Sequence, residues 1–326
     1  MLTIVLTGRN DDHGSDFRDR LFRTLRFNRR ELMARGIRHE YVFVEWAPKP
    51  GRRLLVDLMA EEVPGLGPDV LTSYIVDAEY QEALSLQPRL EYLEFMAKNV
   101  GIRRARGSYI LSTNCDVYLG RHVLDAFERG DLKPRIVYRA ARHDLKLGSE
   151  HSNLTWDVLE DPRNLDGPPR GLRFPLLTGG TGDFVLLDRD TFHELRGFNE
   201  IYRLARMGID ANFLVKAFSC GVDIVDIGGP VYHVNHVGSY RLSRNSYEGR
   251  EAEAPWGDRR WRYHGVVYNN HAGWGLADAP MRDLGGGRWQ VEFDWKAVPP
   301  LVDLHSVVLP VDRVGRPQPR RYVNKK

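Results

Sequence analysis

From the N-terminus to Thr113, the chain alternates between short apolar runs and longer segments in which apolar residues recur at helical spacing. Four runs have the length and composition of buried strands: Thr3–Thr7, Tyr41–Trp46, Leu71–Val76 and Tyr109–Thr113. Helical periodicity covers the segments between them: Phe17–Gly36, Leu54–Val63 and the stretch from about Arg89 to Ala105. Strands that alternate with helices predict an α/β fold in which a mostly parallel sheet carries helices on both faces.

Composition and charge exclude several other classes of protein. Hydrophobic residues make up 42% and charged residues 28% of the 326 residues, which is typical of a folded globular chain. With 47 basic and 44 acidic residues, the net charge of +3 does not indicate a nucleic-acid-binding protein. Cys115 and Cys220 provide no disulfide framework, so a reducing compartment is expected. No signal-peptide or membrane-spanning pattern is present, and we expect a cytoplasmic protein, with peripheral membrane contact left open.

Polar residues follow two of the predicted strands at the point where each strand ends. Gly8–Asp12 follows the first strand, and Asn114-Cys115-Asp116 follows the fourth. Because ligands of such sheets bind outside the carboxyl ends of the strands, both clusters lie where a binding site is expected. Asp116 is a candidate carboxylate ligand for Mg²⁺ or Mn²⁺. From its position alone, a role in capping the next turn accounts for it equally well.

The sequence that leads to this cluster resembles a known family. Ala97–Leu111 is similar to the stretch A-x-N-x-G-x-x-x-A-x-G-x-Y-I-L of GT-A glycosyltransferases, which have a Rossmann-like nucleotide-binding sheet and use nucleotide-sugar donors. In that fold the stretch leads to a metal-binding D-x-D motif, and Asn114-Cys115-Asp116 resembles the N-x-D variant of bacterial family-2-like enzymes. The resemblance implies that Asp116 binds the metal. It also implies that Asn114, Asn99 and Arg103 lie near the donor.

The first loop carries the same resemblance. Thr7-Gly8-Arg9-Asn10-Asp11 resembles the strand-one loop that holds the nucleotide in GT-A enzymes. The donor contacts that this implies are Thr7, Arg9, Asn10 and Asp11, with Asp11 accepting hydrogen bonds from the base or ribose. A turn of this composition also occurs for purely structural reasons.

In the second half, the order of several motifs is similar to that of the same superfamily. They are Gly179-Gly180-Thr181-Gly182-Asp183-Phe184, Gly197-Phe198-Asn199-Glu200 and Gly208-Ile209-Asp210. There the Gly-Gly loop lines the sugar pocket, which implies such a role for Gly179 and Gly180. Asp210 matches the catalytic base of the inverting families, at a helix N-terminus whose dipole would favour its ionised form. Ile209 stands where the family has Glu, and a helix N-cap is the structural alternative for Asp210.

Two histidines follow the next predicted strand, Val222–Ile227. The segment from Cys220 onward is similar to polypeptide N-acetylgalactosaminyltransferases and their relatives, in which a histidine after this strand completes the metal site. That likeness implies His233 as a ligand, with His236 as the competing candidate. A lone histidine is more often structural, but two candidates at the expected place favour Mn²⁺ or Mg²⁺ binding together with Asp116.

The sequence therefore predicts a metal-dependent glycosyltransferase for polysaccharide or glycoconjugate synthesis. Its donor is expected to be a nucleotide-diphosphate sugar, UDP-type first, and its acceptor a hydroxyl of a carbohydrate or glycoconjugate. The first hypothesis is an inverting reaction with Asp210 as base; the alternatives are a retaining transferase and a non-catalytic nucleotide-sugar or carbohydrate-binding relative.

The expected domain organisation follows from the extent of these motifs. Residues 1–240 form a GT-A domain, with a nucleotide-binding half (1–120) and an acceptor and metal half (121–240). Residues 241–326 form a C-terminal extension rich in Trp and Arg. Its tryptophans build either a small satellite core or a surface on which sugars stack.

Overall fold

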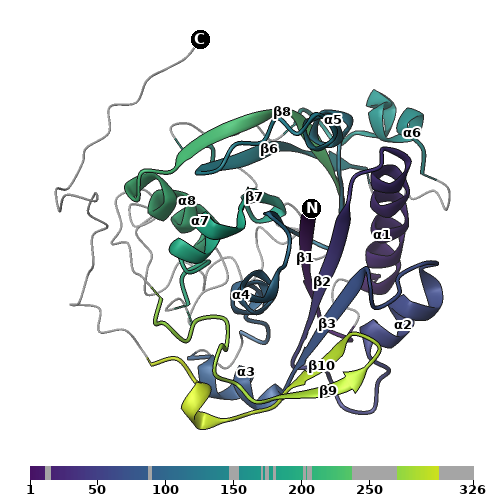
Figure 1. Cartoon of the computed structure of the whole chain (residues 1–326). Coiled ribbons are helices and arrows are strands. Elements are labelled where there is room, and N and C mark those ends of the chain that lie inside the picture. The colour runs from purple at the N-terminus through teal and green to yellow at the C-terminus, as the bar shows by residue number, and fades with distance from the viewer. Residues whose placement is uncertain are drawn as a thin grey trace.

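The computed structural model describes residues 1–11, 16–86, 90–146, 154–169, 172, 176–178, 181–200, 203, 208–236 and 270–300. Within them, ten strands form one sheet with helices on both faces (Figure 1). The strands are β1 (Leu2–Gly8), β2 (His39–Trp46), β3 (Leu71–Val76), β4 (Tyr109–Thr113), β5 (Val117–Tyr118), β6 (Ile136–Leu145), β7 (Phe184–Asp188), β8 (Asp223–Val234), β9 (Met281–Gly285) and β10 (Arg288–Val291). Their order in space is β5-β8-β6-β7-β4-β1-β2-β3-β10-β9.

Most of the sheet is parallel. The strands from β4 through β1, β2 and β3 to β10 run parallel to their neighbours, as the alternation of strands and helices predicts. β7 enters antiparallel between β4 and β6. β6 and β8 form another parallel pair, and β5 adds to β8 in the antiparallel sense. The predicted α/β class with a mostly parallel sheet is confirmed, and β7 joins the two halves of the chain into one sheet.

Alternate residues of each strand enter two hydrophobic cores, because successive side chains of a strand point to opposite faces. In β2, Val42 and Val44 lie in one core, and Tyr41 and Phe43 lie in the other. The core of Tyr41 is covered by α1 (Phe17–Ala34), α2 (Leu55–Glu62) and α5 (Arg121–Arg129). The core of Val42 is covered by α3 (Ala78–Leu84), α4 (Glu94–Arg104), α7 (Arg189–Glu194) and α8 (Ile209–Ser219). The predicted helices on both faces are thus present.

Two glycines let α4 and its following turn lie close to the sheet. A Cβ on Gly101 would stand 2.6 Å from Cγ1 of Val5, inside the contact distance of two carbon atoms. A Cβ on Gly107 would stand 2.7 Å from the backbone nitrogen of Thr3. Both glycines belong to the Ala97–Leu111 stretch, so its glycine pattern has a packing reason that does not depend on any ligand.

The periodicity of the sequence does not predict β5, α5 or β6. β6 carries three charged side chains that are nearly inaccessible: Arg139, Arg142 and Asp144 are 0%, 7% and 3% exposed. Buried charges of this kind are tolerated where they pair with one another, as Arg142 and Asp144 do. They interrupt the apolar pattern by which a buried strand is recognised, which explains why the strand is missed.

Residues 270–300 come from the predicted C-terminal extension and pack on the same sheet. β10 pairs in parallel with β3, and β9 continues the sheet as an antiparallel neighbour. Trp274 is 3% exposed and lies in the core of α4, whereas Trp295 is 71% exposed. The domain boundary at residue 240 stays a prediction, but these described residues share the core of the main domain.

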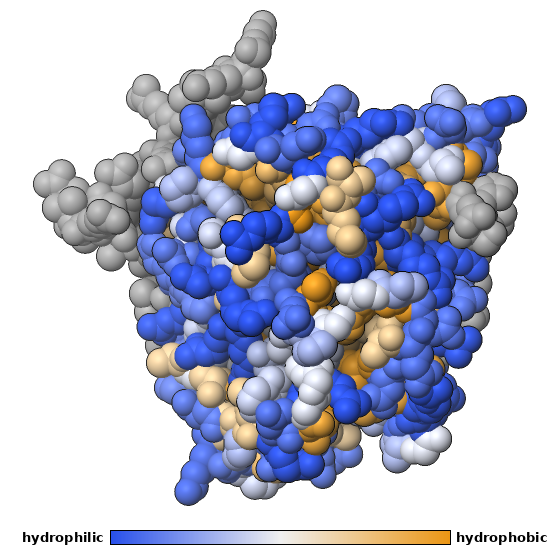
Figure 2. Space-filling model, turned by 45° about the vertical axis from the view of Figure 1, so that its right-hand side comes forward, coloured by the Kyte–Doolittle hydropathy of each residue, from blue (hydrophilic) through white to orange (hydrophobic). Residues whose placement is uncertain are grey.

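The described helices include none with the length and apolar character needed to cross a bilayer. Figure 2 shows a mostly hydrophilic face on which hydrophobic side chains form small separate patches. The remaining short helices are α6 (Trp156–Glu160) and the 3₁₀ turns Pro162–Asn164, Thr181–Asp183 and Trp295–Ala297.

Candidate functional site

The pairing of β5 with β8 brings together residues that are far apart in the sequence. Asp116 directly precedes β5, and its carbonyl oxygen accepts a hydrogen bond from the backbone nitrogen of Val234 at 2.9 Å. Val117 lies opposite His233 in the antiparallel register. His236 follows the end of β8 by two residues. The sheet topology therefore sets Asp116 beside both histidines.

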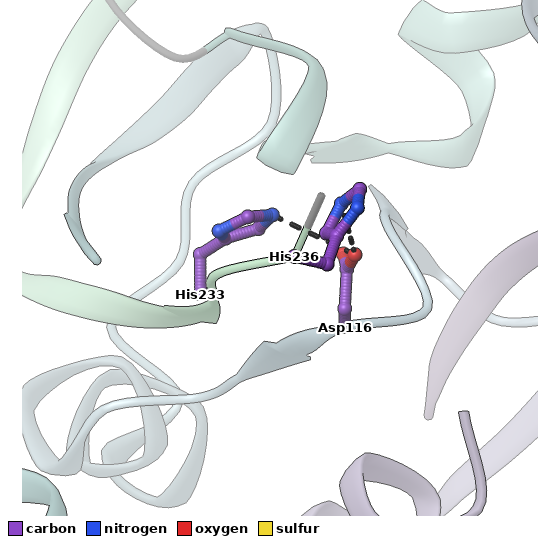
Figure 3. A group of neighbouring side chains, drawn as sticks. All are labelled: Asp116, His233 and His236. Carbon is purple, nitrogen blue, oxygen red and sulfur yellow. Dashed lines mark ion pairs between the residues drawn. The ribbon is translucent and has the colours of Figure 1, made fainter. Parts of the chain in front are cut away.

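Asp116, His233 and His236 point toward one another (Figure 3). One potential ligand atom from each residue lies within 4.8 Å of the others. Nε2 of His233 is 3.6 Å, and Nε2 of His236 is 3.3 Å, from Oδ2 of Asp116. Ligands that bind one ion at about 2.1 Å are separated from each other by about 3–3.5 Å. The two distances between histidine and carboxylate therefore lie close to those of ligands that share one cation.

The chemistry of this group also fits a divalent cation. Two imidazoles and one carboxylate form a donor set that suits ions such as Mn²⁺, Fe²⁺ and Zn²⁺. All three residues are buried. Nε2 of His236 faces Asp116, while its Nδ1 is buried and has no hydrogen-bond partner among the described residues. The predicted metal ligands are thus brought together, and their role stays a proposal.

The charges of Asp116 and His233 depend on each other. Burial alone would raise the pKa of Asp116, but the charge of His233 and hydrogen bonds from His233 and His236 hold it well below its usual range. Burial alone would lower the pKa of His233, but Asp116 raises it, against the charge of Arg142. Because a metal-binding imidazole must be neutral, cation binding here would release the proton that Asp116 stabilises.

Arg20 of α1 holds the Asp116 carboxylate from the other side. Its Nη1 donates to Oδ2 of Asp116 at 2.7 Å, and its Nε donates to Oδ1 of Asp16 at 2.8 Å. The sequence analysis missed this arginine. The available signal was its helical spacing with Thr24 and Phe27, because all three lie on the buried side of α1.

Asn114 uses both ends of its amide to hold neighbouring protein groups. Oδ1 accepts from Nζ of Lys98 at 2.7 Å, and Nδ2 donates to Oδ1 of Asp183 at 2.8 Å. Lys98 is fully buried, pairs with Glu94 at 2.8 Å and donates to the carbonyl of Gly182 at 3.0 Å. Asn114 therefore ties α4 to the turn before β7, and its predicted role at the donor stays a prediction.

A chain of buried ion pairs and hydrogen bonds connects Asp183 to His233 through Arg142 and Asp144. Nη1 of Arg142 donates to Oδ2 of Asp183 at 2.8 Å, while Nε and Nη2 reach Oδ1 of Asp144 at 2.7 and 2.6 Å. Nδ1 of His233 lies 2.8 Å from Nη2 of Arg142 and 3.0 Å from Oδ1 of Asp144. The sequence analysis missed these contacts. A pair of opposite charges two residues apart, on one face of a strand, was the signal.

Asp210 lies in the first turn of α8, whose N-cap is Gly208, so the alternative of Asp210 as the N-cap residue is wrong. Burial raises the pKa of Asp210, while the backbone N–H of Ala211 and the charges of Arg139 and Lys98 act in the opposite direction. A Cβ on Gly182 would stand 3.4 Å from Oδ2 of Asp210. The carboxylate therefore lies beside Gly182, the residue of this turn that carries no side chain.

In the first loop, Arg9 and Asn10 contact protein groups. Arg9 donates to the carbonyl of Glu91 and pairs with the carboxylates of Asp11 and Glu91. The Asn10 amide donates to the carbonyl of Lys49 at 3.1 Å and accepts from its backbone nitrogen at 2.6 Å. Oδ1 of Asp11 is buried without a hydrogen-bond partner among the described residues. Of these three predicted contacts, Asp11 retains an acceptor for a ligand.

Asn99 and Arg103 of α4, the two residues predicted to contact the nucleotide-sugar donor, form hydrogen bonds with other segments of the protein. Asn99 is 0% exposed and exchanges hydrogen bonds at 2.8 Å with the backbone nitrogen and carbonyl of Phe198. Arg103 donates at 3.1 Å to the carbonyls of Ala272 and Trp274. Asn99 also donates to Oε1 of Glu200 at 2.9 Å, so both side chains fasten other segments to α4. Their predicted contact with the donor stays a prediction.

The remaining predicted contacts are Thr7, Gly179 and Gly180. Thr7 is 7% exposed, and its carbonyl accepts from Sγ of Cys115 at 3.1 Å, which ties the end of β1 to the N-x-D segment. Gly179 and Gly180 lie outside the described residues. Their predicted place in the sugar pocket stays a prediction.

A cavity of about 560 Å³ opens between the first turns of α1 and α2. It is lined by Asn10, Asp16, Phe17, Arg18, Asp19, Arg52, Arg53, Leu55 and Leu58. Since Asp16 pairs with Arg20, and Arg20 pairs with Asp116, one side chain links the wall of this cavity to the candidate metal group. Its volume is within the usual range for small-molecule sites.

No protein-family model and no curated protein matches the chain. Among solved structures, TarS 1–349 of S. aureus is 11% identical, with coverage of 80% of this chain and 72% of that one and a TM-score of 0.43. GalNAc-T7 with UDP, GalNAc and Mn²⁺ is 14% identical, with 79% of this chain and 49% of that one covered and a TM-score of 0.44. This chain thus spans about half of GalNAc-T7.

A further similar structure is the mannosyltransferase PcManGT of Pyrobaculum calidifontis, with GDP-Man and Mn²⁺. It is 17% identical, with 85% of this chain and 72% of that one covered and a TM-score of 0.42. Its name places it in the class of enzymes that the sequence resembles. All three TM-scores are low, so these similarities do not by themselves assign an activity to this chain.

Proposed function

We propose that this chain is a GT-A glycosyltransferase that moves a sugar from a nucleotide-diphosphate donor to an acceptor hydroxyl. The observation that carries the proposal is the convergence of Asp116, His233 and His236 at the end of β4. This is the edge of a parallel sheet at which ligands bind. The N-x-D motif that the sequence analysis singled out supplies the carboxylate of this group.

Asp116, His233 and His236 would hold the cation, with Mn²⁺ as the ion to test first because imidazole and carboxylate ligands suit it. A divalent cation bound there would offset the negative charge that develops on the leaving diphosphate. Arg20 adds a fixed positive charge on the same carboxylate and keeps it in place. Oδ1 of Asp11 would accept a hydrogen bond from the nucleoside, and a UDP-type donor follows from the resemblance alone.

Asp210 would take the proton of the acceptor hydroxyl in an inverting reaction. Burial brings its pKa up from the ordinary value of a carboxyl, which improves it as a base near neutral pH. The positive charges of Arg139 and Lys98 oppose that shift and favour the ionised form. Lys98, whose charge acts on Asp210, donates hydrogen bonds to Asn114 of the N-x-D segment and to the carbonyl of Gly182 beside Asp210.

The decisive experiment is nucleotide binding with and without Mn²⁺. Thermal shift and calorimetry with UDP, GDP and dTDP should reveal one nucleotide that stabilises the chain only when Mn²⁺ is present. His233→Ala should abolish the Mn²⁺-dependent part, whereas the exposed Lys133→Met control should retain it. Absence of Mn²⁺-dependent binding for all three nucleotides would contradict the proposal.

Product analysis then separates the alternatives. NMR of the glycosidic linkage distinguishes inversion from retention at the anomeric carbon. Tight, Mn²⁺-dependent nucleotide binding without any transfer or donor hydrolysis would favour the non-catalytic relative.

A further inference from the structure

Nδ1 of His233 lies between a hydrogen-bond donor and a hydrogen-bond acceptor. Nη2 of Arg142 is 2.8 Å away, and Oδ1 of Asp144 is 3.0 Å away. A guanidinium only donates and a carboxylate only accepts, while a neutral imidazole carries a single N–H. The neutral ring can therefore hydrogen-bond to only one of the two neighbours through Nδ1 at a time, and each neighbour requires a different tautomer. In the neutral ring, Nδ1 either donates a hydrogen bond to Asp144 or accepts a hydrogen bond from Arg142.

The two tautomers differ at the opposite nitrogen, which faces Asp116. When Nδ1 donates to Asp144, Nε2 presents a lone pair toward the space shared with Asp116 and His236. When Nδ1 accepts from Arg142, Nε2 carries a proton and is closed to a cation. Histidines that bind metals in proteins generally donate their other N–H to a carboxylate or carbonyl. Only the contact with Asp144 is compatible with a cation on Nε2.

The surroundings keep the His233 ring in this position. Asp144 and His233 are register partners on the parallel strands β6 and β8. Arg142 cannot swing away freely, because Nη1 is held by Oδ2 of Asp183 at 2.8 Å. His233 itself is 3% exposed, so water does not readily replace either neighbour.

We propose that Asp144 is a positioning residue that selects the cation-binding tautomer of His233, and that Arg142 stabilises the competing tautomer. This inference rests on the cation site of the proposed function but not on sugar transfer. The class of ligand concerned is a divalent cation that accepts an imidazole nitrogen.

The test measures the affinity of the whole chain for Mn²⁺ alone, by calorimetry or by the EPR signal of free Mn²⁺. Asp144→Ala removes the acceptor and leaves Arg142 as the neighbour of Nδ1, so we expect Mn²⁺ to bind about 10- to 100-fold more weakly. Asp144→Asn keeps an amide oxygen that accepts from Nδ1, so its loss should be smaller. The control is Glu40→Ala, since Glu40 is also buried and bonded to an arginine, Arg106. It should lower thermal stability without changing the Mn²⁺ affinity.

A second readout follows the tautomer. In the wild-type chain loaded with diamagnetic Zn²⁺, nitrogen NMR should place the proton of His233 on Nδ1 and the metal on Nε2. Unchanged Mn²⁺ affinity in both Asp144 variants, or Zn²⁺ on Nδ1, would overturn the inference. A wild-type chain that binds no Mn²⁺ would overturn both the cation site and the inference. If Mn²⁺ affinity falls from the wild type to Asp144→Asn to Asp144→Ala as expected, but the chain transfers no sugar, the proposed function alone would be refuted.

Discussion

Lys216 makes the pH dependence of folding a test of the core around α8. Its side chain is 1% exposed, and Nζ donates to the carbonyl of Gly197 at 3.2 Å. Burial lowers the pKa of Lys216 from 10.5 to about 7, while Cys220 and Glu200 act in the opposite direction. The folded chain therefore holds this proton less tightly than the unfolded chain. Between pH 7 and pH 10.5 the unfolded state binds more protons, so stability should rise with pH across that window.

The size of the effect follows from the shift. One pKa unit corresponds to about 1.4 kcal/mol of difference between the two protonation states. Near pH 7 the buried lysine of the folded chain is about half protonated, whereas that of the unfolded chain is almost fully protonated. Integrated from pH 7 to pH 9, this difference should raise the free energy of unfolding by about 2 kcal/mol.

The assay is denaturant unfolding at pH 7 and pH 9 for the wild type, Lys216→Met and Lys133→Met. Methionine has a similar length and no charge, so Lys216→Met should be more stable than the wild type at pH 7 and lose about half of that advantage at pH 9. Lys133 is exposed, and its replacement should leave the pH dependence of the wild type intact. Parallel pH dependences of the wild type and Lys216→Met would refute the reasoning.

The candidate site and the sheet lead to three more expected outcomes. Asp210→Asn should reduce turnover by about 10²- to 10⁴-fold in a transfer assay, because the proton acceptor is lost. Nucleotide affinity, measured by calorimetry, should stay nearly unchanged, and equal losses in both would contradict a role as base. His236→Ala should weaken Mn²⁺ binding by calorimetry because one of three converging ligands is removed, and an unchanged affinity would exclude His236 from the site. Gly101→Ala should lower the free energy of unfolding by about 1–3 kcal/mol, because the new methyl group would lie 2.6 Å from Cγ1 of Val5; a neutral result in urea unfolding would mean that α4 shifts at no cost.

Much of the first half of the fold was accessible from the sequence. The predicted strands Leu71–Val76 and Tyr109–Thr113 coincide with β3 and β4, because a short apolar run between turns carries its own signal. The helix predicted from about Arg89 begins at Glu94 instead. β6 was not predicted because its buried charges interrupt the apolar pattern. They are stabilised by one another and by Asp183 and His233, and the last two are distant partners that cannot be recognised from local sequence.

The candidate site shows the same division. The sequence singled out Asp116, His233 and His236, and the structure places them together. It also nominated Asn99 and Arg103, whose polar atoms bond to other groups of the protein, and their contact with a donor stays a prediction. Motif spacing identifies which residue types recur, but it does not distinguish a side chain that faces a ligand from one that fastens a neighbouring segment.

The sequence by itself therefore determined the α/β class, the strand ends that carry polar clusters, and the three residues of the candidate cation site. These properties depend on periodicity and residue chemistry within short segments. Only the tertiary structure decided that β5 pairs with β8, which sets Asp116 beside His233. It alone placed Arg142 and Asp144 against that histidine, because the register between distant strands determines which buried charges meet.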